Sequence, residues 1–295
     1  MARIIKKLLG AYRRARIRPR IERTFKRRLG YAPDLRNPRT YCEKIQWLKL
    51  HHNANDPSII ERADKYRVRG VVERMGFAEH LVPLHGVYDR PEDIDWDALP
   101  ARFVLKLNNA SGARFRWFVD DKSRFPIPQF EKEARYRLDY DYASRYGELH
   151  YGKIPPKIVA EALLGRPGEK IVDYNFYCFH GKVAFLTVEE GRRERYSTAI
   201  DYFDTDWARL PYASPDDPPK PAAPFARPRK LQRMVRMAEV LSAGYPHVRV
   251  DLYHVDDRIY FGELTYTPDA GFIPWQPREL DYELGRLMDL GDITH

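Results

Sequence analysis

The stretch VRVDLYHVDDRIYFGELTYTPDAG, residues 248–271, contains two runs in which apolar side chains alternate with polar ones. Alternation with a period of two residues is typical of β-strands with one buried face. A polar segment, Asp256, Asp257 and Arg258, separates the two runs. We therefore predict a β-hairpin here, and hairpins of this kind belong to antiparallel sheets.

Each run of this hairpin carries one acid, Asp251 in the first and Glu263 in the second. A three-residue loop at 256–258 pairs Val255 with Ile259 and places Asp251 directly opposite Glu263, whereas a two-residue loop places the acids on opposite faces. Directly opposed side chains lie about 5 Å apart, and like charges there are destabilising. A divalent cation between the carboxylates would remove that repulsion. A solvated polar face is the alternative explanation, and the spacing alone leaves both open.

The composition is that of a globular protein. Hydrophobic residues make up 43% of the 295 residues and aromatic residues 13%, enough for one core divided into two or three lobes. No run of 18 apolar residues and no signal-peptide pattern occurs, which argues against a membrane span and against secretion. The two cysteines, Cys42 and Cys178, form no zinc-binding pattern. We therefore expect a cytoplasmic protein.

The positive charge is concentrated at the N-terminus. Residues 1–28 hold twelve Lys or Arg and one acid, Glu22, so this segment carries +11, whereas the whole chain carries +9. Such a basic arm can bind an anionic membrane surface, nucleic acid or another anionic polymer. Apolar residues among the lysines favour a peripheral helix on the inner face of the membrane, although Pro19 is expected to interrupt it. A solubilising tail is the alternative.

Helical and strand patterns alternate along the rest of the chain. Thr40 and Glu43 form a capping-box pattern, and His180-Gly181 is a hairpin signal. We predict helices over 41–50, 63–76 and 231–244, strands over 102–109 and 155–165, a hairpin over 173–188, and a loop over 211–228, which holds seven prolines. Frequent hairpins favour an α+β fold with mainly antiparallel sheets.

A lysine and a turn of small residues follow one another near the strand at 102–109. Lys106 is followed by Asn108 and Asn109 and then by Ala110-Ser111-Gly112. A flexible loop next to a lysine can cover the phosphates of a nucleotide. Because neither a Walker motif nor GxGxxG occurs, a surface lysine before a turn also explains the pattern.

Taken together, these stretches resemble the ATP-grasp superfamily, and within it the TupA-like branch linked to teichuronopeptide and other cell-surface polysaccharide synthesis. The resemblance covers roughly residues 25–290 and leaves out the basic arm. It is carried, in the family's order, by NPRTYCEKIQWLKL, ADKYRVRGVV, LPARFVLKLNNASG, IPPKIVAEALL, DYNFYCFHGKV and the opening hairpin.

The resemblance implies an α+β ATP-grasp fold, in which two lobes with mainly antiparallel sheets grip the nucleotide. It divides the chain into the basic arm (1–28), an N-terminal helical segment (29–100), a small lobe with a flexible phosphate loop (101–165) and a C-terminal lobe with a metal site (166–295). The implied cofactors are ATP and Mg²⁺.

The resemblance also implies roles for individual residues. Matched position by position, these are Lys106, Arg69 and Ser111 at the nucleotide phosphates, with Lys65 a less favoured alternative to Arg69; Glu161, Ala162, Leu163 and Leu164 at the hinge beside adenine; Asp173 at the ribose; Asp251, Glu263 and Thr265 at magnesium; and Arg249 at the transition state. Two positions depart from the family: Thr265 stands where most members have Asn, and Asn175 where the branch often has Lys.

The implied reaction is an ATP-dependent carboxylate–amine ligation through an acylphosphate, which joins an amino acid or another amine to an acidic saccharide or its lipid-linked precursor. Arg192, Arg193 and Arg195 are candidates for contacts to phosphate or acceptor. The basic arm would hold the enzyme at an anionic membrane, and we expect no nucleic-acid partner.

Two other function classes remain. A metal-dependent glycosyltransferase is suggested by two DxD patterns, Asp204-Thr205-Asp206 and Asp139-Tyr140-Asp141, although two matches in one chain show how unspecific the pattern is. A non-catalytic or nucleic-acid-binding protein that uses the arm is the third hypothesis.

Overall fold

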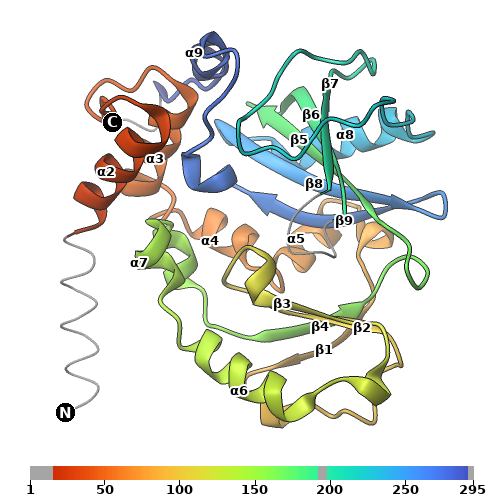
Figure 1. Cartoon of the computed structure of the whole chain (residues 1–295). Coiled ribbons are helices and arrows are strands. Elements are labelled where there is room, and N and C mark those ends of the chain that lie inside the picture. Colours follow the sequence, from red (N-terminus) through yellow and green to blue (C-terminus); the bar gives the residue numbers. More distant parts are fainter. Residues whose placement is uncertain (1–15, 192–197, 292–295) are drawn as a thin grey trace, which may run out of the picture.

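The computed structural model describes residues 16–191 and 198–291, and its architecture consists of two antiparallel sheets that face each other (Figure 1). The first sheet has the order β1-β4-β2-β3 and the second the order β7-β6-β5-β8-β9. The predicted α+β class with antiparallel sheets is confirmed. Among the described residues, no helix is both long and apolar enough to cross a membrane.

The four-stranded sheet belongs to the smaller lobe. It consists of β1 (Leu84–Tyr88), β2 (Phe103–Leu107), β3 (Arg116–Val119) and β4 (Ile158–Ala162). Phe103 and Leu105 are fully buried on the side of Phe130 in α6 (Ile127–Leu138), and the alternate residues of β2, including Lys106, face the other sheet. Strand β1 precedes residue 100 and β2 follows it, and both belong to this sheet because β1 pairs with β4. The domain boundary that we expected after residue 100 therefore lies between two strands of one sheet.

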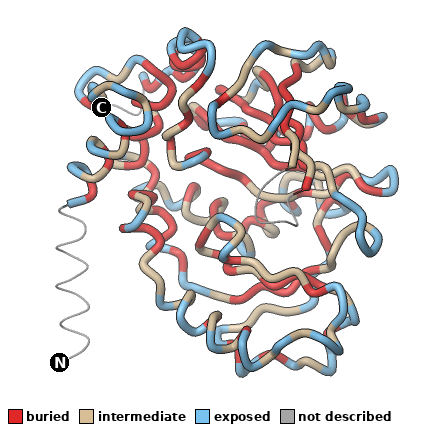
Figure 2. The backbone as a smooth tube through the Cα atoms, viewed as in Figure 1, coloured by how far each residue is buried: buried red, intermediate tan, exposed pale blue. Residues whose placement is uncertain are grey.

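The five-stranded sheet belongs to the larger lobe. It consists of β5 (Val172–Phe179), β6 (Lys182–Glu190), β7 (Ala199–Phe203), β8 (His247–Val255) and β9 (Arg258–Thr265). On one face it packs against α8 (Leu231–Ser242), whose Met234, Ala238 and Leu241 are fully buried as the helical spacing predicts. Figure 2 shows that buried residues follow these central strands. The predicted proline-rich loop precedes α8 as expected.

The opposite face of the large sheet is divided in two. At one end Tyr177 and Phe185 pack under α3 (Tyr41–His51) and α9 (Glu279–Leu287) in a second apolar core. The capping box of Thr40 and Glu43 at the start of α3 is present as predicted. At the other end the face carries polar side chains and looks toward the small lobe. The site described below occupies this polar half.

Part of the basic arm is a helix that packs against the body of the protein. Helix α2 (Ile17–Leu29) buries Ile17, Ile21 and Phe25. We expected Pro19 to interrupt the helix, and this was wrong. Pro19 lies in the first turn, where a proline removes no intrahelical hydrogen bond, and the helix continues through it. The rest of the arm, residues 1–15, lies outside the described residues, as do Arg192, Arg193 and Arg195.

The helix predicted over 63–76 begins later than expected, as α5 (Val68–Arg74), and residue 63 ends a separate helix, α4 (Pro57–Ala63). Between them, the backbone leaves the helical conformation at Asp64. The Asp64 carboxylate accepts hydrogen bonds from the backbone N–H groups of Tyr66 and Arg67 and closes a turn between the two helices. The predicted start was wrong because periodicity does not register a turn that interrupts an otherwise continuous pattern.

Candidate functional site

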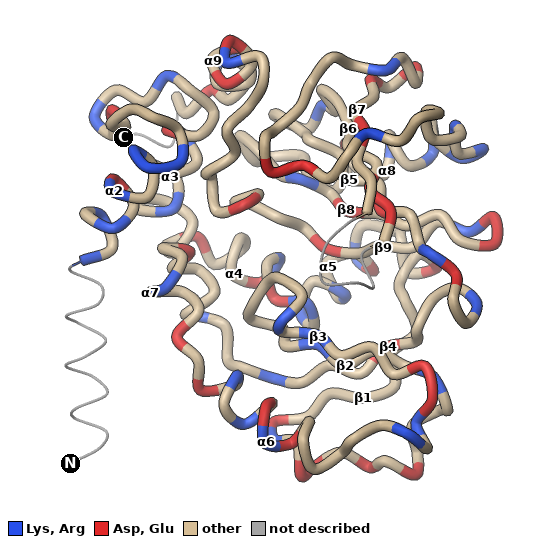
Figure 3. The backbone as a smooth tube through the Cα atoms, in the orientation of Figure 1, with Lys and Arg blue, Asp and Glu red and all other residues tan. Residues whose placement is uncertain are grey.

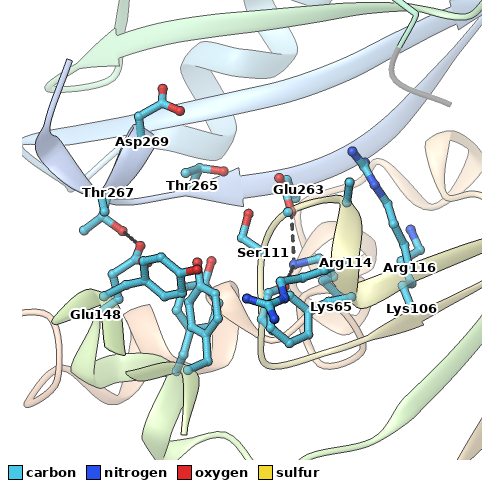
Figure 4. Close-up of a pocket in the computed structure, with 18 of the residues that line it drawn as sticks. Lys65, Lys106, Ser111, Arg114, Arg116, Glu148, Glu263, Thr265, Thr267 and Asp269 are labelled. Carbon is cyan, nitrogen blue, oxygen red and sulfur yellow. Dashed lines mark hydrogen bonds and ion pairs between the residues drawn. The ribbon is translucent and has the colours of Figure 1, made fainter. Parts of the chain in front are cut away.

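A cavity of about 1510 Å³ lies between the two sheets. The small sheet contributes Lys106 and Glu161 to its wall, and the large sheet contributes Arg249 and Glu263. Figure 4 shows Lys106 and Glu263 on the two sides of the cavity. The predicted site residues that line the cavity are Lys106, Ser111, Glu161, Ala162, Leu163, Leu164, Asp173, Arg249, Glu263 and Thr265.

The turn of the β8–β9 hairpin differs from our prediction. It has two residues, Asp256 and Asp257, and Val255 pairs with Arg258. Both turn residues have positive φ, 47° and 56°, which is the geometry that two-residue hairpin turns require. On the reasoning of the previous section, such a turn should place the two acids on opposite faces.

A bulge at Gly262 restores the facing of the acids. The register shifts by one residue between the pairs Leu252–Phe261 and Asp251–Glu263, so Asp251 lies opposite Glu263. A Cβ at Gly262 would stand 2.9 Å from the carbonyl oxygen of Asp251, which explains why glycine occupies the bulge. The predicted pairing is confirmed, but the predicted reason for it was wrong.

Asp251 is held by Arg249, two residues before it on β8. The Nε and Nη2 atoms of Arg249 donate to the two carboxylate oxygens of Asp251, at 2.8 and 2.7 Å. Burial alone would lower the pKa of Arg249, but the Asp251 charge and its hydrogen bonds raise that pKa well above the usual range. Arg249 is therefore a permanent, rigidly oriented cation in the cavity wall, and Asp251 lies behind it, outside the cavity lining.

Glu263 is paired with a cation from another part of the chain. Lys65 Nζ lies 3.1 Å from Glu263 Oε2 and donates to the Ala110 carbonyl at 2.8 Å (Figure 4). Lys65 is on the turn between α4 and α5, and the amide of Asn108 donates to Asp64 in that turn, at 2.9 Å. Lys65 is thus positioned by contacts between segments that are distant in sequence.

The third cation at the cavity is Lys106. Its Nζ lies 2.5 Å from Glu161 Oε2, while Arg69 Nη1 lies 3.2 Å from Glu161 Oε1. Glu161 therefore joins β2, β4 and α5. Lys106 lines the cavity, but Arg69 does not.

The loop after β2 completes this wall. Ala110, Ser111 and Gly112 line the cavity. Gly112 has φ 96° and ψ 162°, a backbone conformation that glycine adopts readily and other residues rarely adopt. Arg114 and Arg116 follow and also line the cavity. A strand lysine, a glycine turn and two arginines together form a positively charged cover over the cavity.

A sequence model of the TupA-like ATP-grasp family matches residues 43–289. The chain belongs to the TupA-like ATP-grasp family. This membership confirms the resemblance, and the two facing antiparallel sheets agree with the ATP-grasp fold.

Solved structures with a similar fold are distant in sequence. The L-amino acid ligase from Bacillus licheniformis is 14% identical with a TM-score of 0.47, over 72% of this chain and 45% of that chain. The D-alanine–D-alanine ligase from Helicobacter pylori is 14% identical with a TM-score of 0.43, over 79% and 62%. The chain thus spans about half of the length of these proteins. No curated protein matches it.

Lys65 and Arg69 are the two candidates for a second phosphate contact, and they lie differently in the structure. Lys65 lines the cavity and Arg69 does not; Arg69 donates to the Val82 carbonyl and to Glu161. The role of either residue stays a prediction. The turn that places Lys65 at the cavity is closed by Asp64, directly before it in the sequence.

Two acids that line the cavity, Glu148 and Asp269, were not predicted from the sequence. Glu148 is buried, and it accepts a hydrogen bond from the Thr267 hydroxyl (Figure 4). Burial raises the pKa of its carboxyl group. Nearby Lys49 is also buried, which lowers its pKa to about 8. No sequence pattern around Glu148 indicates a functional residue, so only the fold shows that it lines the cavity.

The donor atoms on this face fit a magnesium ion. Asp251, Glu263 and Thr265 offer carboxylate and hydroxyl oxygens on one face of the hairpin, and Mg²⁺ prefers oxygen ligands. The amide oxygen of Asn175, which pairs with Asp251 across β5 and β8, is buried and accepts no hydrogen bond from the described part of the chain. In this structure the negative charge of Asp251 is paired with Arg249, and that of Glu263 with Lys65.

Proposed function

We propose that the protein is an ATP-dependent carboxylate–amine ligase. The carboxylate would come from a uronic acid of a cell-surface polysaccharide or its lipid-linked precursor, and the amine from an amino acid. Family membership supports the ATP-grasp chemistry, and the acidic saccharide agrees with the positive wall of the cavity. The reaction would take place in the cytoplasm.

The observation that carries the proposal is the convergence of Lys106, Lys65 and Arg249 on one cavity, each held by a carboxylate. Phosphoryl transfer depends on positioning and on charges that are oriented before the reaction. A carboxylate partner fixes each cation without burying it completely. The three cations are therefore ready to receive phosphate oxygens as charge develops.

The reaction would proceed in two steps. A substrate carboxylate oxygen attacks the γ-phosphorus of ATP, and ADP leaves. The amine then attacks the carbonyl carbon of the acylphosphate, inorganic phosphate leaves, and the amine loses a proton. Lys106 and Lys65 would hold the phosphate oxygens in the first step, and Arg249 would stabilise the oxyanion in both.

Asp251, Glu263 and Thr265 would hold Mg²⁺, which when bound neutralises charge on the phosphates. Glu263 faces the cavity already, whereas one oxygen of Asp251 would exchange its bond to Arg249 for the metal. At the other wall, the backbone of residues 161–164 would bind adenine and Asp173 the ribose. Because hydroxyl is a weaker ligand than an amide oxygen, Thr265 would hold the metal through water.

The DxD segments do not favour a glycosyltransferase. Asp204 accepts backbone hydrogen bonds from Asp206 and Ala208 within its own turn. Asp141 caps α7 (Tyr142–Tyr146). None of these acids lines the cavity, so they have the contacts of structural caps.

The first test is nucleotide binding and turnover in wild type and in Glu263→Gln. We expect MgATP to raise the melting temperature of wild type by a few degrees, as a ligand at about 100 times its Kd contributes roughly 2.7 kcal/mol. Glu263→Gln should form ADP at least about 100-fold more slowly in the presence of amines and uronic acids. Glu239→Gln, on the far face in α8, is the matched control and should behave as wild type.

Two results would contradict the proposal. Stabilisation by a UDP-sugar without any response to MgATP would favour the glycosyltransferase. ADP formation by Glu263→Gln within a few-fold of wild type would remove this residue from the metal site.

A further inference from the structure

One face of α2 forms part of the cavity wall. Arg20, Arg23, Thr24 and Arg27 recur at intervals of three or four residues and all line the cavity. The neighbouring face of the helix carries the buried residues that attach it to the protein. Figure 3 shows the basic residues along α2.

The position of α2 is fixed by close packing. A Cβ on Gly147, which has φ 71°, would lie 3.0 Å from Ile21 Cδ1. Phe25 packs edge-on against Phe272, with ring centroids 6.4 Å apart. Arg20 Nη1 donates to the Ser144 carbonyl at 2.9 Å. The helix is therefore joined to both α7 and the loop after β9, which fixes the side from which its arginines reach the cavity.

The arginines of α2 differ in their partners, and Arg28, which also lines the cavity, is paired with Asp216. Arg18, which does not line the cavity, is paired with Glu22 at 3.0 Å. By contrast, Arg23 and Arg27 make no ion pair within residues 16–191 and 198–291, and neither does Arg145 of α7 across the same wall. Like charges four residues apart on a helix destabilise it slightly. These three arginines, gathered in one concave wall, point to an anionic ligand.

This charged wall is distant from the expected nucleotide. The hinge at 161–164 lies at one end of the cavity. From there, β9 carries Glu263 and then Thr265 toward Thr267 and the turn η6 (Pro268–Gly271), near α2 and α7 (Figure 1). Lys106 and Lys65 serve the nucleotide end, so the arginines of α2 and α7 are available for a second substrate.

We propose that Arg20, Arg23, Arg27 and Arg145 bind the acceptor, a saccharide with several closely spaced carboxylate or phosphate groups. Arginine is suited to both, because its planar guanidinium binds either oxyanion through two parallel hydrogen bonds. This inference rests on the proposed function and assigns it an acceptor subsite. It also gives residues 17–29 of the basic arm a role in binding substrate at the cavity.

The test is a binding titration of the full chain with trigalacturonate and, separately, with UDP-glucuronic acid, in the presence of MgATP. Arg23→Glu/Arg27→Glu should weaken binding of the preferred anion at least tenfold and leave the Kd for MgATP within twofold. Lys26→Glu, on the exposed side of the same helix, is the matched control and should bind as wild type. Trigalacturonate carries only carboxylates, whereas UDP-glucuronic acid carries one carboxylate and a diphosphate. Tighter binding of UDP-glucuronic acid would therefore indicate a phosphate acceptor, and tighter binding of trigalacturonate a carboxylate acceptor.

Arg145→Glu, on a different helix, should produce a similar loss even if the α2 variant loosens that helix. Unchanged saccharide binding in both variants would overturn the subsite. So would a wild type that binds vesicles of anionic phospholipid but neither saccharide. Failure of wild type to bind MgATP would instead count against the proposed function, because the saccharide titration can also be made without nucleotide.

Discussion

The two hairpins of the large sheet share one backbone plan. The β5–β6 hairpin turns at His180-Gly181 and the β8–β9 hairpin at Asp256-Asp257, and all four residues have positive φ. Each turn is followed by a bulge in the returning strand. The bulge lies at residue 184 in the first hairpin and at residue 262 in the second.

The hairpins differ in the first pair of residues beyond the bulge. In β5–β6 this pair is Tyr177 and Phe185, whose rings stack at 4.4 Å with an angle of 13° between planes. In β8–β9 it is Asp251 and Glu263. The same backbone device thus turns side chains onto one face of the sheet, and the residue types decide whether that face closes a core or lines a cavity.

Gly262→Val should have the largest effect, because a Cβ at this position would stand 2.9 Å from the Asp251 carbonyl oxygen and would force β9 into a continuous register with residue 262 opposite Asp251. Glu263 would then move to the opposite face from Asp251. We expect ADP formation to fall below detection and the magnesium-dependent thermal shift with ATP to disappear. Since β9 is an edge strand, circular dichroism should show the sheet retained. A Gly262→Val variant that keeps MgATP turnover would show that the facing of the acids is unnecessary.

Phe185→Ala should affect stability and not chemistry. Phe185 is 1% exposed and also contacts Trp275 edge-on at 5.9 Å. Loss of a buried phenylalanine costs about 3–5 kcal/mol, measurable by urea unfolding, while the KM for ATP should stay within a few-fold at a temperature where the variant is folded. Phe185→Leu should recover most of the stability. Loss of ATP turnover in a variant of normal stability would contradict the division between core and cavity.

The sequence predicted the strands of both hairpins, but not the bulges. Alternation is a local property, and it identified β5, β6, β8 and β9. The bulge does leave a trace, because the apolar spacing in β9 changes from two residues, between Ile259 and Phe261, to three, between Phe261 and Leu264. In β6 residues 183–186 are all apolar, so no such change can be read there. A search for this change of phase would have found the bulge in β9 but not the one in β6.

The position of Lys65 could not be predicted in this way. It depends on Asp64, which interrupts a helical pattern, and on a hydrogen bond from Asn108, 44 residues further along the chain. The sequence predicted that the α2 segment is basic, but not that its arginines line the cavity. Their position there depends on the contact between Ile21 and Gly147. Patterns within a segment give its type, whereas contacts between segments decide which of its charges enter the cavity.

The smallest expected effect is at the turns. Gly181→Ala places a Cβ on a residue with φ 74° and 3.2 Å from the Cα of Ala243, so we expect a loss of about 1–2 kcal/mol, or a few degrees in melting temperature. Position 257 already holds a non-glycine residue at φ 56°, so Asp257→Ala should lower the free energy of unfolding by less than Gly181→Ala does. Equal losses in both variants would mean that the turns are interchangeable. A larger loss at Gly181 would mean that the β5–β6 turn also depends on its contact with the end of α8, which the β8–β9 turn lacks.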